Sequence, residues 1–234
     1  MKGTLYLLPN LLHSEASMER YMPKILWEVV NHLHGLIAES PKEGRAFLKR
    51  MGRAPASLLQ GVLNEHSTPE EIEVLLTPLR RGETWGYVTD AGMPCFADPG
   101  AQLVARARQE DIAIEAIIGP SSILLAIMLC GLPSQRFAFH GYLPQDPIAL
   151  KKAIKSLEKR SQEEAATQLF IETPYRNLKL FKALLQDLSL NTKLSVLCNL
   201  TAPDELVITQ TIAQWKKALL PDLDKKPTLF IFLA

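Results

Sequence analysis

Short apolar runs alternate with segments of helical periodicity along the whole chain, and this alternation limits the possible folds more than any other feature. Four runs in the first half are typical of strands: Thr4–Leu8, Leu36–Ala38, Trp85–Thr89 and Ile112–Ile118. Two segments between them, Pro69–Leu79 and Ala101–Gln109, carry apolar residues at the spacing of an amphipathic helix. Strands that alternate with helices predict a parallel sheet with helices on both faces.

The second half continues the alternation, but its last strands follow one another closely. Strands are predicted at Arg136–His140, Gln168–Ile171, Leu194–Leu200, Leu206–Thr211 and Thr228–Leu233. Helices are predicted at Ser122–Leu129, Ile148–Lys159, Arg176–Leu188 and Ile212–Leu219. Because short connections join antiparallel strands, part of this sheet should be antiparallel. The predicted fold class is therefore α/β, with a mainly parallel N-terminal sheet and a mixed C-terminal sheet.

Turn residues at Gly119–Pro120 mark the best boundary between the two halves. We therefore expect an N-terminal α/β domain at residues 1–118 and a C-terminal α/β domain at residues 119–234. Loops at the carboxyl ends of strands converge where two such domains meet, so a ligand cleft between the domains is expected.

Charge and composition exclude several classes of protein. The 234 residues carry a formal net charge of +1, so any contact with a nucleic acid has to come from local basic patches. No apolar run reaches the roughly 18 residues of a membrane span. Met1–Pro9 is too short and too weakly basic for a signal peptide. A cytoplasmic location is the resulting expectation.

Neither a metal site nor a disulfide is expected. Cys95, Cys130 and Cys198 lie far apart, form no CxxC pair and are odd in number, which is typical of buried thiols. His32 and His34 could share one face of a strand, but no further ligand lies near them in the sequence.

The most unusual segment is Asp90–Gly100, DAGMPCFADPG, which directly follows a predicted strand. Its glycines permit backbone conformations that other residues avoid, and its prolines fix the chain and remove donors. Such a loop, at the carboxyl end of a strand, is typical of a ligand site in an α/β sheet. A carboxylate there, such as Asp90, suits ribose hydroxyls or an ammonium group. The alternative role for Asp98 is to cap a helix that starts near Pro99.

Two further loops also connect a strand to a helix. Gly119–Ser122, GPSS, could hold a polar ligand at a helix N-terminus, or Ser121 or Ser122 could cap the helix. Ile171–Arg176, IETPYR, offers Glu172 and Arg176 to a ligand; alternatively Thr173 caps a helix that begins at Pro174. No Walker-type phosphate loop, GxGxxG motif or nucleophile elbow is present, so the usual nucleotide-binding and serine-hydrolase classes lose support.

Taken in order, these loops resemble the tetrapyrrole-methylase superfamily, and most closely its small-subunit ribosomal-RNA 2′-O-methyltransferase family, whose members methylate a cytidine ribose. DAGMPCFADPG resembles the pattern SDAGxPxxSDPG, with Thr89 in place of the leading serine. The segments GPSS, CGLPSQRFAFHGYLP, ETPYR and LIAES resemble the family's PGxS, SGLPxxxFxFxGFLP, ESPHR and IAEDTR segments. The likeness extends from about residue 4 to residue 233.

Three segments depart from the family's pattern. PNLLHSE at Pro9–Glu15 replaces a TPIGNL loop, and Ser40–Pro41–Lys42 replaces the acidic-threonine-arginine that follows IAE. TAPDE at Thr201–Glu205 replaces a TKxHE segment. The loops that bind the methyl donor in this family are thus kept better than the loops that face the methyl acceptor. This pattern is consistent with a paralogous branch that methylates a different target.

The resemblance implies S-adenosylmethionine as methyl donor, a homodimer and ribosomal RNA as partner. Matching positions would place the donor against eight residues: Pro9, Asp90, Met93, Ser121, Ser122, Ile171, Leu200 and Pro227. A ribose hydroxyl is a weak nucleophile that benefits from a nearby base. The carboxylates that we would test as catalytic bases are Glu39, Glu172 and Glu205.

Two basic stripes at helical spacing could neutralise phosphates, although such stripes are also common on solvated helix faces. One comprises Lys42, Arg45, Lys49 and Arg53, and the other Lys152, Lys155 and Lys159. Together with Arg176, the first stripe supplies the candidate RNA contacts.

Three functions therefore remain open. The first is an RNA ribose methyltransferase. The second is a methylase of a small molecule or a protein, with a tetrapyrrole as an example. The third is a non-catalytic donor-binding protein that acts in ribosome assembly.

Overall fold

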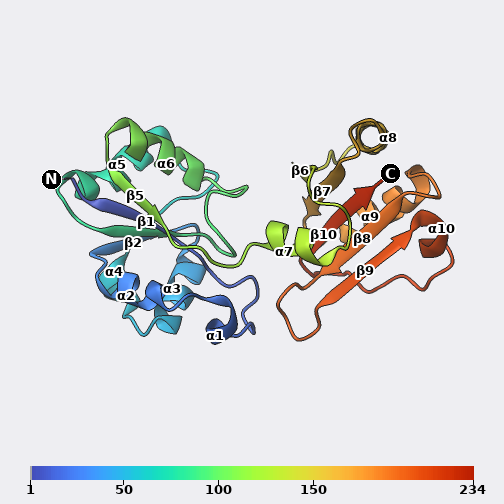
Figure 1. Ribbon diagram of the computed structural model, residues 1–234. Helices are drawn as coiled ribbons and strands as arrows, with labels where there is room; N and C mark the ends of the chain where they lie inside the picture. The colour runs from blue at the N-terminus through green and yellow to red at the C-terminus, as the bar shows by residue number, and fades with distance from the viewer. Residues whose placement is uncertain (1) are drawn as a thin grey trace. The chain divides into compact units, whose positions relative to one another are not determined.

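The computed structural model describes residues 2–234 and contains two compact units, Met1–Ser121 (unit 1) and Ser122–Ala234 (unit 2) (Figure 1). Each unit is built around its own five-stranded sheet with helices packed on both faces. The predicted α/β class is therefore confirmed.

The sheet of unit 1 is parallel throughout and has the strand order β3-β2-β4-β1-β5. Its strands are β1 (Thr4–Leu8), β2 (Gly35–Ala38), β3 (Leu59–Val62), β4 (Trp85–Val88) and β5 (Ala113–Ala116). Strands β2 and β4 are buried at every position because helices cover both of their faces. The loops that follow β1, β2 and β4 consequently leave the sheet side by side at its carboxyl edge.

Helices cover this sheet in two layers. Figure 1 shows α5 and α6 on one side and α2, α3 and α4 on the other. The helices are α1 (Met18–Tyr21), α2 (Ile25–Asn31), α3 (Pro41–Arg50), α4 (Pro55–Leu58), α5 (Pro69–Arg80) and α6 (Gly100–Gln109). Helix α5 begins as the sequence predicts, with Thr68 and Glu71 forming a capping box around Pro69.

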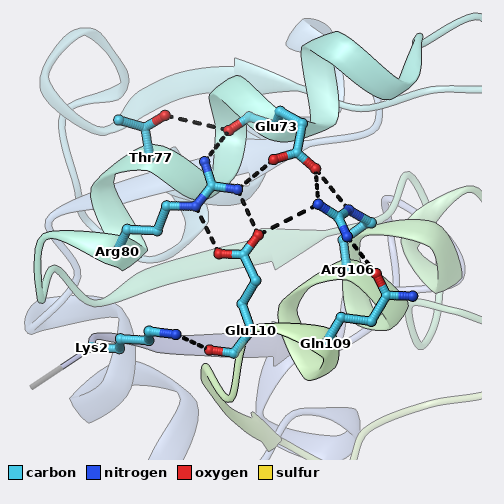
Figure 2. Close-up of polar contacts among 7 residues, drawn as sticks. All are labelled: Lys2, Glu73, Thr77, Arg80, Arg106, Gln109 and Glu110. Atoms are coloured by element: carbon cyan, nitrogen blue, oxygen red, sulfur yellow. Dashed lines mark hydrogen bonds and ion pairs between the residues drawn. The ribbon is translucent and has the colours of Figure 1, made fainter.

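An ion-pair network joins α5 to α6 at the opposite, amino edge of the sheet (Figure 2). Arg80 donates to both oxygens of Glu110 at 2.7 and 2.6 Å, and Arg106 Nε donates to Glu73 Oε1 at 2.7 Å. Both arginines also pair with Glu73 through their terminal nitrogens, and Lys2 Nζ donates to the Glu110 carbonyl. The arginines lower the pKa values of the Glu73 and Glu110 carboxyls. This network connects the segments that precede β1, β4 and β5.

The sheet of unit 2 is mixed, as the close spacing of its last strands predicts. Its order is β6-β7-β10-β8-β9, in which only the β6–β7 pair is parallel. The strands are β6 (Phe137–Tyr142), β7 (Thr167–Glu172), β8 (Lys193–Cys198), β9 (Leu206–Thr211) and β10 (Thr228–Leu233). Helices α8 (Pro147–Glu164), α9 (Asn177–Asp187) and α10 (Ile212–Trp215) cover one face, and α7 (Ser122–Leu129) packs on the other.

Several elements differ from the sequence-based expectation. Strand β3 and the short helices α1, α2 and α4 were not predicted, and α10 ends at Trp215 rather than Leu219. Thr173 does not cap a helix that starts at Pro174: α9 begins at Asn177. The reason is local, because the Thr173 hydroxyl donates to Glu172 Oε1 instead of accepting from the helix, and Arg176 N donates to the Thr173 carbonyl at 2.9 Å in a turn before α9.

A buried glutamate fixes the turn between α9 and β8 against α8. Glu158 is 4% exposed, and its carboxylate accepts hydrogen bonds from Ser189 N at 2.6 Å, Thr192 Oγ1 at 2.8 Å and Lys155 Nζ at 3.2 Å. Burial acts to raise the pKa of this carboxyl, but the hydrogen bonds outweigh burial and lower it. The ionised form therefore stabilises the folded state.

We predict that Glu158→Gln lowers the free energy of unfolding by about 2 kcal/mol at neutral pH, because the amide keeps only one acceptor for a buried set of donors. A carboxyl with a lowered folded pKa contributes stability above its ordinary value of 4.5 and loses it as the pH falls through the folded value. The difference from wild type should therefore shrink below about pH 4.5. Urea unfolding at several pH values checks this, with the exposed Glu163→Gln on the same helix as control. A constant difference from pH 7 to about pH 3 would contradict the assignment.

Candidate functional site

Three loops of unit 1 meet at the carboxyl edge of its sheet. The loop after β1 pairs with the loop after β4 through two backbone hydrogen bonds, Asn10 N to Gly92 O at 2.8 Å and Gly92 N to Asn10 O at 3.2 Å. The loop after β5 packs on the first, because a Cβ atom added to Gly119 would lie 2.2 Å from the Cβ of Pro9. Gly92 has a φ of 76°, which L-residues rarely adopt. Both glycines are thus required for this approach.

The side chain of Asn10 connects four groups at this edge. It is 1% exposed and uses all of its hydrogen-bonding capacity. Its amide nitrogen donates to the carbonyls of Thr89 at 3.0 Å and Asp90 at 3.1 Å. Its amide oxygen accepts from Leu11 N at 2.9 Å and from Arg50 Nη2 at 2.8 Å. The start of the loop after β4 is therefore bound firmly to the loop after β1.

The loop after β2 binds Asp90 from another side. Glu39 Oε2 accepts from Asp90 N at 2.9 Å and also from the Thr89 hydroxyl. Ser40 Oγ donates to Asp90 Oδ1 at 2.7 Å and, as N-cap of α3, accepts from Glu43 N at 3.3 Å. The amide, carbonyl and one carboxylate oxygen of Asp90 are thus all bound within unit 1.

The second carboxylate oxygen of Asp90 is different. Among residues 2–234, Asp90 Oδ2 has no hydrogen-bond partner, and the residue is exposed. A carboxylate fixed at one oxygen and open at the other is a preformed acceptor for a hydroxyl or an ammonium group.

The rest of this loop is compact and conformationally restricted. Cys95 and Ala97 have positive φ values of 68° and 61°, and Met93 is half-buried. Asp98 Oδ1 accepts from Gly100 N at 2.7 Å and from Tyr87 Oη at 3.1 Å. Asp98 thus contacts the first residue of α6, although the N-cap residue of this helix is Pro99 and not Asp98 as predicted. Burial raises the pKa of the Tyr87 hydroxyl and, with the nearby Asp98, raises that of the Cys95 thiol to about 11.

The predicted donor residues of unit 2 gather at one edge of its own sheet. Ile171 and Leu200 belong to the same apolar cluster as Ile123 of α7. Asn199 N donates to Pro227 O at 2.9 Å, which brings Pro227 beside the end of β8. Ser121 is buried at the end of unit 1, and Ser122 is the first residue of α7 in unit 2. Residues far apart in sequence therefore share one edge within each unit.

The remaining two candidate carboxylates are also bound to their own turns. Glu172 is buried; besides its contacts with Thr173, its Oε2 lies 2.9 Å from Arg176 Nη2 in an ion pair. Glu205 Oε2 accepts from Thr201 N at 2.7 Å, which stabilises a turn in which Thr201 has a φ of 71°. The TAPDE segment is therefore an ordered turn.

The basic stripe on α3 is only partly available to a ligand. Lys42, Arg45 and Lys49 are exposed. Arg53, however, donates to the carbonyls of Val30 at 3.0 Å and Asn31 at 2.7 Å, at the end of α2. In the second stripe, on α8, Lys155 pairs with Glu158 and Lys159 with Glu163, and Lys152 is exposed.

Four residues of this site were not predicted from the sequence as site residues: Asn10, Ser40, Thr89 and Arg50. Asn10, Ser40 and Thr89 lie within two residues of a strand end, which is the signal that could have identified them. Arg50 lies at the last turn of α3 and carried no such signal.

Some kinds of site are not seen in the part of the chain that the structure describes. Within residues 2–234, no three His, Cys, Asp or Glu side chains are grouped so that they could hold a metal ion. None of the helices in this range has both the length and the apolar composition that crossing a membrane requires. The three cysteines are free; Cys130 and Cys198 are buried and Cys95 is half-buried.

The amino-acid sequence of this chain matches one protein family and several curated proteins. Residues 29–216 match the model of the tetrapyrrole (corrin/porphyrin) methylases. Two curated relatives are both called ribosomal RNA small subunit methyltransferase I. The one from Escherichia coli O157:H7 is 30% identical over 76% of this chain and 58% of its own length, and the one from Xylella fastidiosa is 32% identical over 74% and 60%. The chain thus spans about three fifths of the length of these relatives.

Solved structures agree on the fold. A diphthine synthase superposes with a TM-score of 0.66 at 15% identity, covering 99% of this chain and 89% of that one. The methyltransferase CobJ gives a TM-score of 0.65 at 11% identity, with coverages of 98% and 93%. Uroporphyrin-III-C-methyltransferase from Thermus thermophilus gives 0.54 at 18% identity, with coverages of 100% and 93%. At these identities the likeness concerns the fold alone.

Proposed function

Since this chain belongs to the family of tetrapyrrole (corrin/porphyrin) methylases, we propose that it is an S-adenosylmethionine-dependent methyltransferase that methylates a ribose 2′-hydroxyl of ribosomal RNA. The names of the curated relatives support the ribosomal RNA substrate. The observation that carries the proposal is the fixed Asp90 carboxylate, which keeps one oxygen open at the carboxyl edge of a parallel sheet.

In unit 1, the residues proposed to contact the donor are Pro9, Asp90, Met93 and Ser121. The open oxygen of Asp90 fits this role, because the donor carries ribose hydroxyls and an ammonium group that can donate to it. Bound S-adenosylmethionine supplies an electrophilic methyl group for direct displacement. Ser122, Ile171, Leu200 and Pro227 stay predictions from the resemblance.

The chain's own contribution to the reaction is proposed to be alignment of the acceptor and removal of its proton. Of the three candidate bases, Glu39 is the one bonded directly to Asp90, and its Oε1 accepts no hydrogen bond within residues 2–234. Glu172 is buried: its Oε1 accepts from Thr173, and its Oε2, which accepts no hydrogen bond, is held in an ion pair with Arg176. Glu205 has one oxygen bound within its own turn. We therefore propose Glu39 first as the base.

The proposed RNA contact of unit 1 is the exposed face of α3. Lys42, Arg45 and Lys49 lie on the helix that begins at Ser40, the residue that donates to Asp90. Phosphate contacts would thus start within one helical turn of the proposed donor site. Arg53 is assigned to helix capping instead, and Arg176 is paired with Glu172. A homodimeric state and a cytoplasmic location also stay predictions; light scattering tests the first.

Transfer of a tritiated methyl group tests the function as a whole. Purified protein, labelled S-adenosylmethionine and total RNA or small ribosomal subunits from a strain that lacks the gene should give label in one ribose of the small-subunit RNA. Label in a tetrapyrrole or a protein would support a different acceptor. Donor binding without label in any of them would favour a non-catalytic role in ribosome assembly.

We predict that Asp90→Asn raises the Kd for S-adenosylhomocysteine by about tenfold or more, because the amide removes a charged acceptor from the donor. Isothermal titration calorimetry measures this value. Asp111→Asn is the matched control, since Asp111 is exposed beyond the last turn of α6. Equal affinities for Asp90→Asn and wild type would remove Asp90 from the donor site.

The variant Glu39→Gln tests whether Glu39 acts as the catalytic base or only holds the loop after β4. Glutamine keeps an oxygen that can accept from Asp90 N, so donor affinity should change by less than about threefold. Methyl transfer should fall by about a hundredfold, because an amide cannot take the proton of the acceptor hydroxyl. Equal losses in the two measurements would exclude Glu39 as the base.

Replacement of Lys42, Arg45 and Lys49 by alanine should weaken binding to small-subunit RNA and reduce its salt dependence. Each lost phosphate contact makes the negative slope of log K against log salt shallower by about 0.7–0.9, so the slope should become less negative by about 2 to 3. Filter binding at several salt concentrations measures the slope, with Lys179→Ala and Lys182→Ala on the exposed side of α9 as controls. An unchanged slope would mean that this face is only solvated.

A further inference from the structure

Arg50 is a partly buried cation that neither the donor contacts nor the proposed base explains. It is half-buried at the last turn of α3, and burial lowers the pKa of its guanidinium. No carboxylate lies within ion-pair distance of it among residues 2–234; Glu43 acts on it only through its more distant charge. Withdrawing a cation from water is unfavourable unless it is bonded, so its contacts matter.

Arg50 contacts the side-chain amide of Asn10, which binds the start of the loop after β4. Its Nη2 donates to Asn10 Oδ1 at 2.8 Å, and this is its one side-chain hydrogen bond within the described residues; its Nε is buried without a partner. The other end of the same amide donates to the carbonyls of Thr89 and Asp90. One amide thus connects a charge on α3 to the residue proposed to bind the donor.

The charge also determines which way round the amide lies. With the oxygen toward Arg50 and Leu11 N, both of these donors find an acceptor, and the amide nitrogen faces two carbonyls. In the reversed orientation the amide nitrogen would face a guanidinium and an N–H, and the oxygen would face the carbonyls of Thr89 and Asp90. Each of these contacts would be repulsive. A donor to an amide oxygen also polarises the amide and strengthens the hydrogen bonds that its nitrogen donates.

We infer that Arg50 is a positioning residue for the donor site: it acts through Asn10 to fix the backbone of Asp90 and does not itself touch the donor. The inference rests on the proposed function for its effect on donor binding, but its effect on the loop is independent of any ligand. Two competing roles are a direct contact with the donor carboxylate and a contact with an RNA phosphate, and each predicts a different outcome below.

The test compares Arg50→Met, Asn10→Asp, Asn10→Ala and the double variant Asn10→Ala/Arg50→Met. Arg108→Met is the matched control, because it removes the same charge from an exposed arginine of α6. Aspartate at position 10 keeps the acceptor for Arg50 and Leu11 but has no donor for the Thr89 and Asp90 carbonyls. Thermal unfolding first establishes that each variant is folded at the temperature of measurement.

Three quantities are measured on the full chain. Calorimetry gives the Kd for S-adenosylhomocysteine, and filter binding gives the affinity for small-subunit RNA. Hydrogen exchange without ligand follows the amides of Asp90 and Gly92, whose acceptors are Glu39 and Asn10. Arg50→Met and Asn10→Asp should each raise the Kd by about tenfold and accelerate exchange at these amides by about tenfold, and Arg108→Met should change neither. The double variant should bind no more weakly than Asn10→Ala alone, because Arg50 acts through Asn10.

Additive losses in the double variant would overturn the inference and assign Arg50 to the donor itself. If Asn10→Ala does not fold, the same comparison is made with Asn10→Leu, which has a similar shape and also removes both ends of the amide. Normal donor affinity and exchange in Arg50→Met, with weaker RNA binding, would overturn it in favour of a phosphate contact. If wild type binds no S-adenosylhomocysteine, the proposed function fails; exchange at Asp90 and Gly92 then still decides whether Arg50 positions the loop.

Discussion

The register of three parallel strands is the constraint on which the candidate site depends. Leu8 and Ala38 both pair with Val88, so β1, β2 and β4 end at one level of the sheet. The next residue of each strand therefore emerges beside the other two, and short side chains suffice to join their loops. A shift of any strand by one residue would reverse its side chains and separate these groups. The position of Asp90 thus follows from the packing of the sheet rather than from the loop alone.

The surface ion-pair network and the proposed ligand contacts lie at opposite ends of unit 1. The ion pairs of Glu73, Arg80, Arg106 and Glu110 lie on segments that enter the strands, and the bonds of Asp90 lie on segments that leave them. The first group joins two helices on the surface, where charges are screened by salt. The second group is partly buried and includes an amide with all its hydrogen bonds formed. We therefore expect substitutions in the surface network to leave the hydrogen bonds of Asp90 in place.

The sequence predicts the elements whose signal is local. Apolar runs identified β1, β4, β9 and β10, and the glycine- and proline-rich loop after β4 identified Asp90. Strand β3, LQGV, was missed because its one fully buried residue is Gly61, which adds no apolar side chain to the pattern. The bond between Asn10 and Arg50 joins residues 40 positions apart, and no spacing rule connects them. Arg53 was counted as a phosphate contact because helical spacing does not reveal that its guanidinium turns back to α2.

The hydroxyl of Ser40 has consequences for which residues this position tolerates. It accepts from the first turn of α3 and donates to Asp90, so one atom has to be acceptor and donor at once. At an ordinary N-cap, serine and aspartate are interchangeable. Here aspartate would serve the helix but would set a second negative charge against Asp90, and alanine would serve neither. Position 40 therefore needs a side chain that donates one hydrogen bond and accepts another, and fewer residues meet this requirement than could cap the helix alone.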